Sequence, residues 1–184
     1  MIAPVDVTNI RLVTERLHLR PWIQSDLADF YEYASVDGVG QMAGWLPHRN
    51  IEESQTILNN FIAEKKTLAL EWKQTGKVIG SLGIEPGRSF DSLPGMGREL
   101  GYVLSKEYWG RGLMPEAVTA VMDYCFRVLG YDYLGCAHFV WNDQSRRVIE
   151  KCGFQFWKES SLETRLGTVE KTKLYIHYNP EKTR

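Results

Sequence analysis

Two glycines, Gly110 and Gly112, lie in the run Glu107–Glu116, between an apolar strand pattern and a helical pattern. A glycine pair at the start of a helix leaves several backbone N–H groups uncrowded, and the helix dipole places partial positive charge behind them. Such a turn binds phosphate, and a side chain at either glycine would block the anion's approach. The same spacing also suits a tight turn without a ligand, so the glycines alone leave both interpretations open.

Two common nucleotide-binding motifs do not match this turn. A dinucleotide-binding fold requires Gly-x-Gly-x-x-Gly, and Pro115 occupies the place of the third glycine. A P-loop ends in Gly-Lys-Ser or Gly-Lys-Thr, and no such sequence follows Gly112. A phosphate site at this turn would therefore belong to another class of fold.

Composition excludes several classes of protein. The 184 residues carry 22 Lys and Arg against 23 Asp and Glu, a formal charge of −1 with no basic block, which argues against nucleic acid as a partner. The cysteines Cys125, Cys136 and Cys152 lie in apolar patterns without zinc spacing, which predicts reduced core thiols and no metal. No signal peptide and no apolar run of about 20 residues is evident. We therefore expect a cytoplasmic protein without membrane contact.

Hydrophobic periodicity predicts the elements that position the glycine turn. Capping residues predict helices that begin at Ser25, at Asn50 and at Asn142 or Asp143, and helical spacing predicts another over 114–129. Alternating patterns predict strands at 16–20, 67–72, 78–84, 98–104, 133–141, 154–158 and 173–178. The order β-α-α-β-β-β-α-β-α-β-β predicts one α/β or α+β domain over 1–184, with a mixed sheet and helices on its faces.

Several motifs accompany the turn in a fixed order. Gly-Tyr-Val-Leu stands at 101–104, Val-Trp-Asn-Asp-Gln-Ser at 140–145 and Glu-Lys-Cys-Gly-Phe at 150–154. Together they resemble the GNAT superfamily of acetyl-CoA-dependent N-acetyltransferases. The opening Thr-Glu-Arg-Leu-His-Leu-Arg-Pro-Trp at 14–22 is similar to the Rim-type branch, which acetylates protein N-termini, including those of ribosomal proteins. The resemblance spans 14–178 and implies a GNAT-like domain in which two parallel strands splay apart to admit coenzyme A.

The resemblance also implies a set of contacts to acetyl-CoA, without a metal. Val103 and Leu104 would bind the pantetheine arm through their backbone groups, as an added strand does. Asn142 would reach the pantetheine or its acyl group, although helix capping explains this asparagine equally. Arg146 or Arg147 could meet the 3′-phosphate. The pyrophosphate would bind backbone N–H groups of the turn, with a charge-assisted contact from the arginine: Trp109, Gly110, Arg111, Gly112, Leu113 and Met114.

Catalysis requires a base for the amine proton, and the resemblance implies Glu99 for this role because Rim-type enzymes carry a glutamate at that position. Burial in an apolar strand would raise its pKa towards the useful range. The strand pattern alone favours a glutamate on the sheet surface instead. The backbone N–H of Val103 or Leu104 would polarise the acetyl carbonyl.

The resemblance identifies the acid that would protonate the leaving thiolate less directly. Many GNAT members place a tyrosine where this chain has Ile149, which cannot donate a proton. Rim-type relatives use a serine three residues after the asparagine, and Ser145 stands there. A serine is a poor acid, so Ser145 would relay a proton or donate a hydrogen bond to the thiolate. A hydrogen bond to the backbone in the first helical turn is the structural alternative.

The Rim-type resemblance implies a protein or peptide N-terminal α-amine, such as that of a ribosomal protein, as the acceptor. A small-molecule amine (amino acid, polyamine or antibiotic), transfer of a longer acyl group, and a non-catalytic acetyl-CoA-binding module remain alternatives. The protein would be a monomer or a homodimer. Acceptor selection would fall to the loops 37–49 and 86–97 and to the final hairpin, with four candidate wall residues: Trp45, His48, Phe90 and Trp157.

Overall fold

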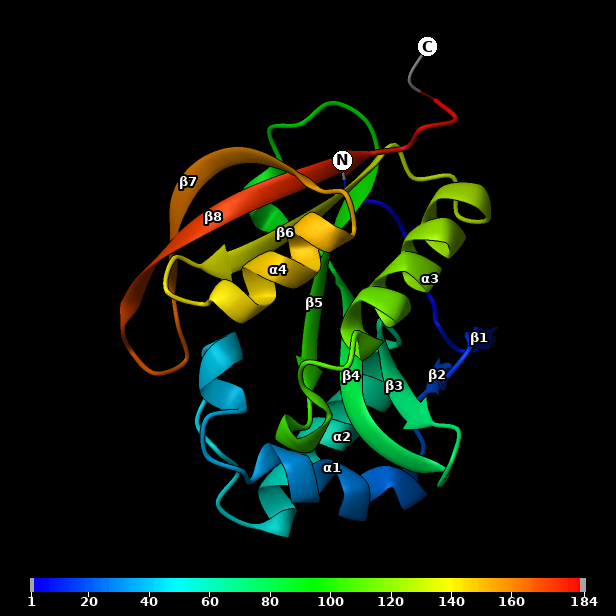
Figure 1. Ribbon diagram of the computed structural model, residues 1–184, viewed down its shortest axis with the longest axis vertical. Coiled ribbons are helices and arrows are strands. Elements are labelled where there is room, and N and C mark those ends of the chain that lie inside the picture. Colours follow the sequence, from blue (N-terminus) through cyan, green and yellow to red (C-terminus); the bar gives the residue numbers. More distant parts are fainter. Residues whose placement is uncertain (1, 183–184) are drawn as a thin grey trace.

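The structure is a computed structural model that describes residues 2–182. Over these residues the chain forms one eight-stranded sheet flanked by four α-helices (Figure 1). The strands are β1 (Leu12–Val13), β2 (Leu17–Pro21), β3 (Thr67–Trp72), β4 (Lys77–Glu85), β5 (Gly97–Leu104), β6 (Tyr133–Phe139), β7 (Gln155–Glu163) and β8 (Val169–Tyr178). The α-helices are α1 (Leu27–Ala34), α2 (Ile51–Glu64), α3 (Leu113–Arg127) and α4 (Asp143–Lys151).

The sheet is mixed, and its one parallel pair of strands lies near the centre. The strand order is β1-β2-β3-β4-β5-β6-β8-β7, with β5 and β6 parallel and the other neighbours antiparallel. The parallel register ends at Leu100 and Cys136. Beyond that point β5 continues to Leu104 along β4, and β6 continues to Phe139 along β8. The two strands therefore diverge, which confirms the splayed parallel pair.

The helices cover both faces of the sheet, as predicted. Strand residues alternate between two hydrophobic cores: Leu68 and Leu70 of β3 join the core under α3 and α4, while Ala69 joins the core under α1 and α2. On β5, Leu104 likewise packs with the first core and Val103 with the second. We call these two sides the α3/α4 face and the α1/α2 face. Glu99 alternates in step with Val103 and therefore belongs to the α1/α2 face.

Two helix caps show where local sequence determined the structure and where it did not. The Asn50 side chain accepts a hydrogen bond from the backbone N–H of Glu53 at 2.9 Å, so the predicted cap of α2 is confirmed. The predicted Ser25 cap of α1 is wrong, because Ser25 lies inside a short 3₁₀ helix, Gln24–Asp26. The residue before α1 is Asp26, whose carboxylate instead binds the Arg20 guanidinium at 2.8 Å.

Candidate active site

The glycine turn joins the end of β5 to the start of α3. Gly110 and Gly112 have φ angles of 74° and 75°, a left-handed conformation that other residues adopt at a cost, and Gly112 is the N-cap of α3. A Cβ atom at Gly110 would meet nothing within 4 Å, and one at Gly112 would meet only an Arg16 nitrogen at 3.7 Å. The glycines therefore shape the backbone and leave open space beside the first N–H groups of the helix.

A carboxylate in the first turn of α3 fastens this turn to the N-terminal segment. Glu116 accepts hydrogen bonds from the Thr14 hydroxyl at 2.5 Å and from the backbone N–H and Nε of Arg16, both at 2.8 Å. Arg16 also donates to the Arg111 carbonyl at 2.9 Å. Burial raises the pKa of Glu116, but these hydrogen bonds outweigh it and hold the pKa below its ordinary value. The opening motif thus supports the loop that carries the glycines.

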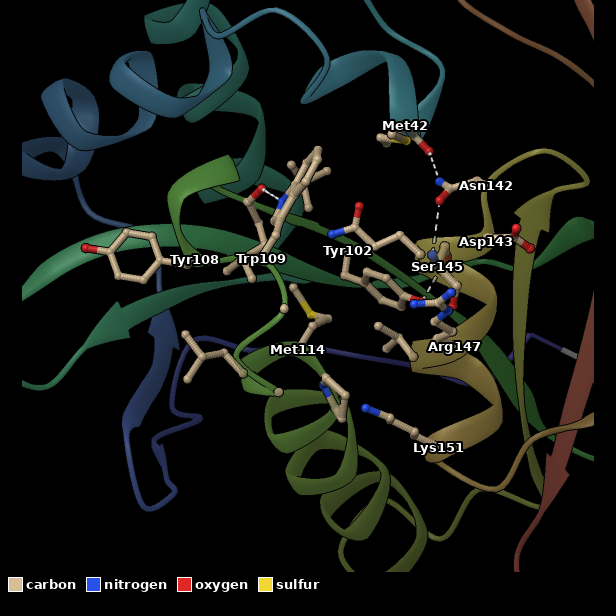
Figure 2. Close-up of a pocket in the computed structure, with 18 of the residues that line it drawn as sticks. Met42, Tyr102, Tyr108, Trp109, Met114, Asn142, Asp143, Ser145, Arg147 and Lys151 are labelled. Carbon is tan, nitrogen blue, oxygen red and sulfur yellow. Dashed lines mark hydrogen bonds between the residues drawn. The ribbon is translucent and has the colours of Figure 1, made fainter.

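A cleft of about 540 Å³ opens beside the turn, mainly on the α3/α4 face, and Val103 of the α1/α2 face also borders it where β5 leaves β6 (Figure 2). Its walls are the end of β5, the turn, the first residues of α3, and α4, with Val39 and Met42 closing one side. The predicted cofactor-binding residues that line it are Val103, Leu104, Trp109, Gly110, Gly112, Leu113, Met114, Asn142 and Ser145. Residues from 103 to 145 are thus brought to one cavity, at the place where β5 leaves β6.

Arg111 is the predicted cofactor contact that does not line this cleft. Its guanidinium carbon lies 5.1 Å from the ring centre of Tyr108, in a cation–π arrangement. The neighbouring Trp109 does line the cleft, and its indole N–H donates to the Leu104 carbonyl at 2.8 Å. These two side chains therefore pack against the turn itself. The Trp109 backbone N–H also donates to the Lys106 carbonyl at 3.2 Å, so the N–H groups that follow it are the ones left for an incoming ligand.

Asn142 is a buried polar residue whose side-chain amide forms hydrogen bonds through both its oxygen and its nitrogen. Its Oδ1 accepts from the Ser145 backbone N–H at 3.0 Å, so Asn142 is the cap of α4. Its Nδ2 donates to the Met42 carbonyl at 3.1 Å. The asparagine thus joins Met42, on one side of the cleft, to the first turn of α4 (Figure 2).

The cleft also contains three residues that sequence reasoning missed or left undecided. Tyr102 of β5 lines it, and its hydroxyl lies 2.9 Å from the Ser145 hydroxyl oxygen. Arg147 and Lys151 line it from α4, and within residues 2–182 neither forms an ion pair. The signal for Lys151 was its spacing, since residues four apart share a helix face.

Arg146 is not placed to contact the 3′-phosphate. Its guanidinium pairs with Asp143 at 3.0 Å and with Glu150 at 2.9 Å on the exposed side of α4. Of the two arginines considered for a phosphate contact, the structure therefore brings Arg147 to the cleft.

Glu99 is half-buried on the α1/α2 face of β5, one residue before the last register pair of the parallel strands. Burial, with a smaller contribution from the charge of Glu85, raises the pKa of Glu99 to about 7. Glu85 is its direct cross-strand neighbour on β4 and binds Lys66 at 2.8 Å. A carboxyl group with this pKa can take up a proton near neutral pH.

The four residues expected to form an acceptor wall lie outside the cleft. His48 is buried and its Nδ1 lies 2.7 Å from the Ser54 hydroxyl, while Trp45 packs on it at 5.1 Å between ring centres. Phe90 is fully buried and stacks on Trp157 at 5.6 Å. Phe90 also covers Gly135, the register neighbour of Glu99, so this pair borders the Glu99 side of the sheet.

Comparison with known proteins agrees with this arrangement. The family described as "Acetyltransferase (GNAT) domain" matches residues 16–155. The chain belongs to the GNAT acetyltransferase family. An N-acetyltransferase of Bacillus subtilis, YoaA, described as uncharacterized, is 30% identical over 179 residues, which cover 92% of this chain and 97% of the relative.

Solved structures share the fold at lower identity. Ribosomal-protein-S5-alanine acetyltransferase from Vibrio fischeri superimposes with a TM-score of 0.75 at 21% identity, covering 96% of this chain and all of that chain. Mycobacterium smegmatis RimJ in complex with CoA-disulfide gives a TM-score of 0.73 at 18% identity, covering 93% and 89%. The predicted GNAT fold is confirmed.

Two other features bear on the kind of protein. Among residues 2–182, no group of three or more His, Cys, Asp or Glu side chains is placed to hold a metal ion. In the same part of the chain, no helix combines the length and the apolar character needed to cross a bilayer.

Proposed function

We propose that this GNAT protein transfers the acetyl group of acetyl-CoA to a primary amine, with the α-amine of a protein or peptide N-terminus as the favoured acceptor. One observation carries the proposal. A cleft with an open helix N-terminus and two cationic side chains lies on one face of β5, and a carboxyl group with a pKa of about 7 lies on the other. The two meet where β5 and β6 diverge.

The residues present fit coenzyme A, which supplies the acetyl group as an activated thioester. Backbone N–H groups at the turn, from Gly110 to Met114, would bind the pyrophosphate, because positive φ at both glycines keeps their approach open. The predicted donor Trp109 is not among them, because its backbone N–H already donates to the Lys106 carbonyl at 3.2 Å. Arg147 and Lys151 supply positive charge for the remaining phosphate. Leu104 lies beyond the last register partner on β6 and turns its backbone groups away from β4, so its N–H would bind the pantetheine arm. Val103 pairs with Ser81 of β4 and would line the arm through its side chain.

Glu99 acts as the general base. An amine arrives mostly as its ammonium form at neutral pH and must lose a proton before or during attack. With a pKa of about 7, Glu99 is about half ionised at neutral pH and accepts that proton without a large energetic penalty. The carboxylate form is the active one, so the rate rises with pH through this pKa and levels off above it.

Ser145 donates a hydrogen bond to the sulfur as the carbon–sulfur bond breaks. Its backbone N–H is already bonded to Asn142, which fixes the residue at the start of α4. Its hydroxyl faces Tyr102 in the cleft wall. The Ser145 hydroxyl contacts the Tyr102 hydroxyl, and the bond to Asn142 is made by the backbone N–H, so the serine proton is free to point to the ligand when Tyr102 is the donor.

The Rim-type motifs and the Vibrio fischeri structure, described as a ribosomal-protein-S5-alanine acetyltransferase, support a peptide α-amine as the acceptor. The carboxylates Glu99 and Glu85 on adjacent strands suit a cationic amine in general. Small amines are therefore the competing class, and experiment separates the two.

A thiol-release assay with acetyl-CoA tests the proposal against two pools of acceptors. One pool holds peptides with free N-termini, the other amino acids, polyamines and aminoglycosides. CoA release that depends on the peptide pool, with a mass gain of one acetyl group at the α-amine, is the expected result. Release with the small amines alone would reassign the acceptor. Binding of acetyl-CoA without release from either pool would favour a non-catalytic binding module.

A further inference from the structure

Two hydroxyl groups from distant parts of the chain meet in the cleft wall. The Tyr102 Oη lies 2.9 Å from the Ser145 Oγ and 3.3 Å from the Ser145 carbonyl oxygen. Tyr102 comes from β5, and Ser145 from the first turn of α4 (Figure 2). Both residues line the cleft proposed for coenzyme A.

The serine is held from two sides. Asn142 accepts a hydrogen bond from the Ser145 backbone N–H, and Asn142 is itself fastened to the Met42 carbonyl. Tyr102 contacts the hydroxyl end of the same residue. Because each hydroxyl has one proton, donation from Tyr102 to the Ser145 oxygen leaves the serine proton directed elsewhere.

Tyr102 is suited to be the permanent donor of this pair. Burial raises the pKa of Tyr102 well above its ordinary value, so the phenol keeps its proton throughout the neutral range. A thiol has an ordinary pKa of about 8.5, and a thiolate is therefore too weak a base to remove a proton from this phenol. The pair can thus give a hydrogen bond to a thiolate while Tyr102 stays protonated.

We propose that Tyr102 is a positioning residue that donates to the Ser145 oxygen and thereby directs the serine proton towards the sulfur of coenzyme A. The inference rests on the proposed function. Ser145 donates its hydrogen bond to the sulfur that retains the electron pair of the broken carbon–sulfur bond, while Glu99 holds the proton lost by the amine. An ammonium acceptor loses two protons in becoming an amide: Glu99 takes one, the other passes to water, and the thiolate is later protonated from water. A phenol on β5 thus serves where Ile149 on α4 can donate nothing.

Binding measurements test the inference without an acceptor amine. We would titrate wild type, Tyr102→Phe and Ser145→Ala with CoA and with desulfo-CoA, by calorimetry at about pH 7 and about pH 9, which bracket the thiol pKa. In wild type, the ratio of CoA affinity to desulfo-CoA affinity should rise about 10-fold with pH, because a hydrogen bond to a charged group is stronger than one to a neutral group. Both variants should lose this rise and keep the desulfo-CoA affinity.

Other titratable and charged groups of the protein lie around the Tyr102–Ser145 pair and would be near either ligand. Cys136 of β6 and Cys152 after α4 adjoin Tyr102, and burial raises the pKa of both thiols. Arg147, Lys151 and Asp143 line the same cleft from α4. The affinity ratio cancels their interactions with the rest of the ligand, and the comparison of wild type with the two variants isolates the share that the hydroxyl pair contributes at the sulfur.

Tyr131→Phe is the matched control. It also removes a buried tyrosine hydroxyl, one that donates to the Pro4 carbonyl at 2.6 Å away from the cleft, and it should keep the wild-type ratio. A full pH-dependent rise in Tyr102→Phe, or in both variants, would overturn the inference. So would a wild-type ratio that does not change with pH while both ligands bind. Failure of wild type to bind either ligand would instead refute the proposed function, and this inference with it.

Discussion

The two faces of the sheet around β5 present opposite chemistry. On the α3/α4 face, the cleft has backbone N–H groups at a helix N-terminus and the cations Arg147 and Lys151. On the α1/α2 face, Glu99 and Glu85 stand side by side on neighbouring strands. A polyanionic cofactor suits the first face and a cationic amine suits the second. The divergence of β5 from β6 is the point where the two can meet.

The faces also differ in how they are built. The cleft depends on backbone shape, because two glycines with positive φ and a capped helix create it. The other face depends on one side chain whose pKa is set by burial and by a like charge. Substitutions should therefore separate binding from turnover according to the face on which they lie.

The largest separation should come from Glu99→Gln. Loss of a general base typically lowers turnover about 10²–10⁴-fold, and the affinity for acetyl-CoA should stay at the wild-type value because Glu99 does not line the cleft. Wild-type kcat/KM should rise through a pKa of about 7 and level off above it, since the ionised carboxylate is the active form. Steady-state rates across this pH range measure both effects. A variant with an unchanged pH–rate profile would remove Glu99 from the mechanism.

Gly112→Val, on the cofactor side, should instead lower the affinity for CoA. A β-branched residue at φ 75° distorts the turn, and its side chain enters the space beside the helix N-terminus. We expect CoA affinity to fall by at least about 10-fold, the equivalent of 1.4 kcal/mol. Gly76→Val is the control: its φ is 72° with open space around it, but it lies in the β3–β4 hairpin. If calorimetry finds equal CoA affinity in the two variants, the turn is not the phosphate site.

A smaller effect is expected for the cations of α4. Arg147→Ala combined with Lys151→Ala should weaken CoA binding about 3- to 10-fold, because partly exposed charge–phosphate contacts are screened by water and salt. Arg146→Ala should change the affinity little, since Arg146 is already paired with Asp143 and Glu150. Titrations at two salt concentrations provide the measurement. Equal losses in the two variants would show a general charge effect and not a phosphate contact.

The smallest expected effect concerns the neighbouring carboxylates Glu85 and Glu99. Glu85→Gln removes a negative charge that raises the pKa of Glu99, so the acid limb of the rate profile should move to lower pH. The variant should be faster than wild type below about pH 7 and equal to it on the alkaline plateau. Glu64→Gln is the matched control, because Glu64 binds the same Lys66 at 3.0 Å and is not a cross-strand neighbour of Glu99. A shift to higher pH would contradict the electrostatic argument.

The sequence predicted those parts of the fold that local patterns determine. The Asn50 and Asn142 caps, the β3–β4 hairpin and the strand–turn–helix around the glycines all follow from residues within a few positions of one another. The two-residue strand β1 was missed because Leu12–Val13 is too short to show a period. The Ser25 cap was wrong because Arg20 binds the nearby Asp26, and that contact fixes the start of α1 differently.

The candidate site was predictable in part for the same reason. The turn and Asn142 are visible in short motifs. The contact between Tyr102 and Ser145 spans 43 residues, and that between Arg16 and Glu116 spans 100, so neither leaves a local pattern. The side of the sheet on which Glu99 lies, and its neighbour Glu85, depend on strand register. Register is set by tertiary pairing, which the alternation of one strand does not reveal.

The central claim is that the cofactor and the general base occupy different faces of the sheet. It is tested most directly by titrating wild type and Glu99→Gln with acetyl-CoA in parallel by calorimetry. The active amine is then added to each sample. Our expectation is that both proteins bind one acetyl-CoA per chain with the same affinity and that wild type alone then releases CoA rapidly. Loss of acetyl-CoA affinity in Glu99→Gln, or rapid release by that variant, would contradict it.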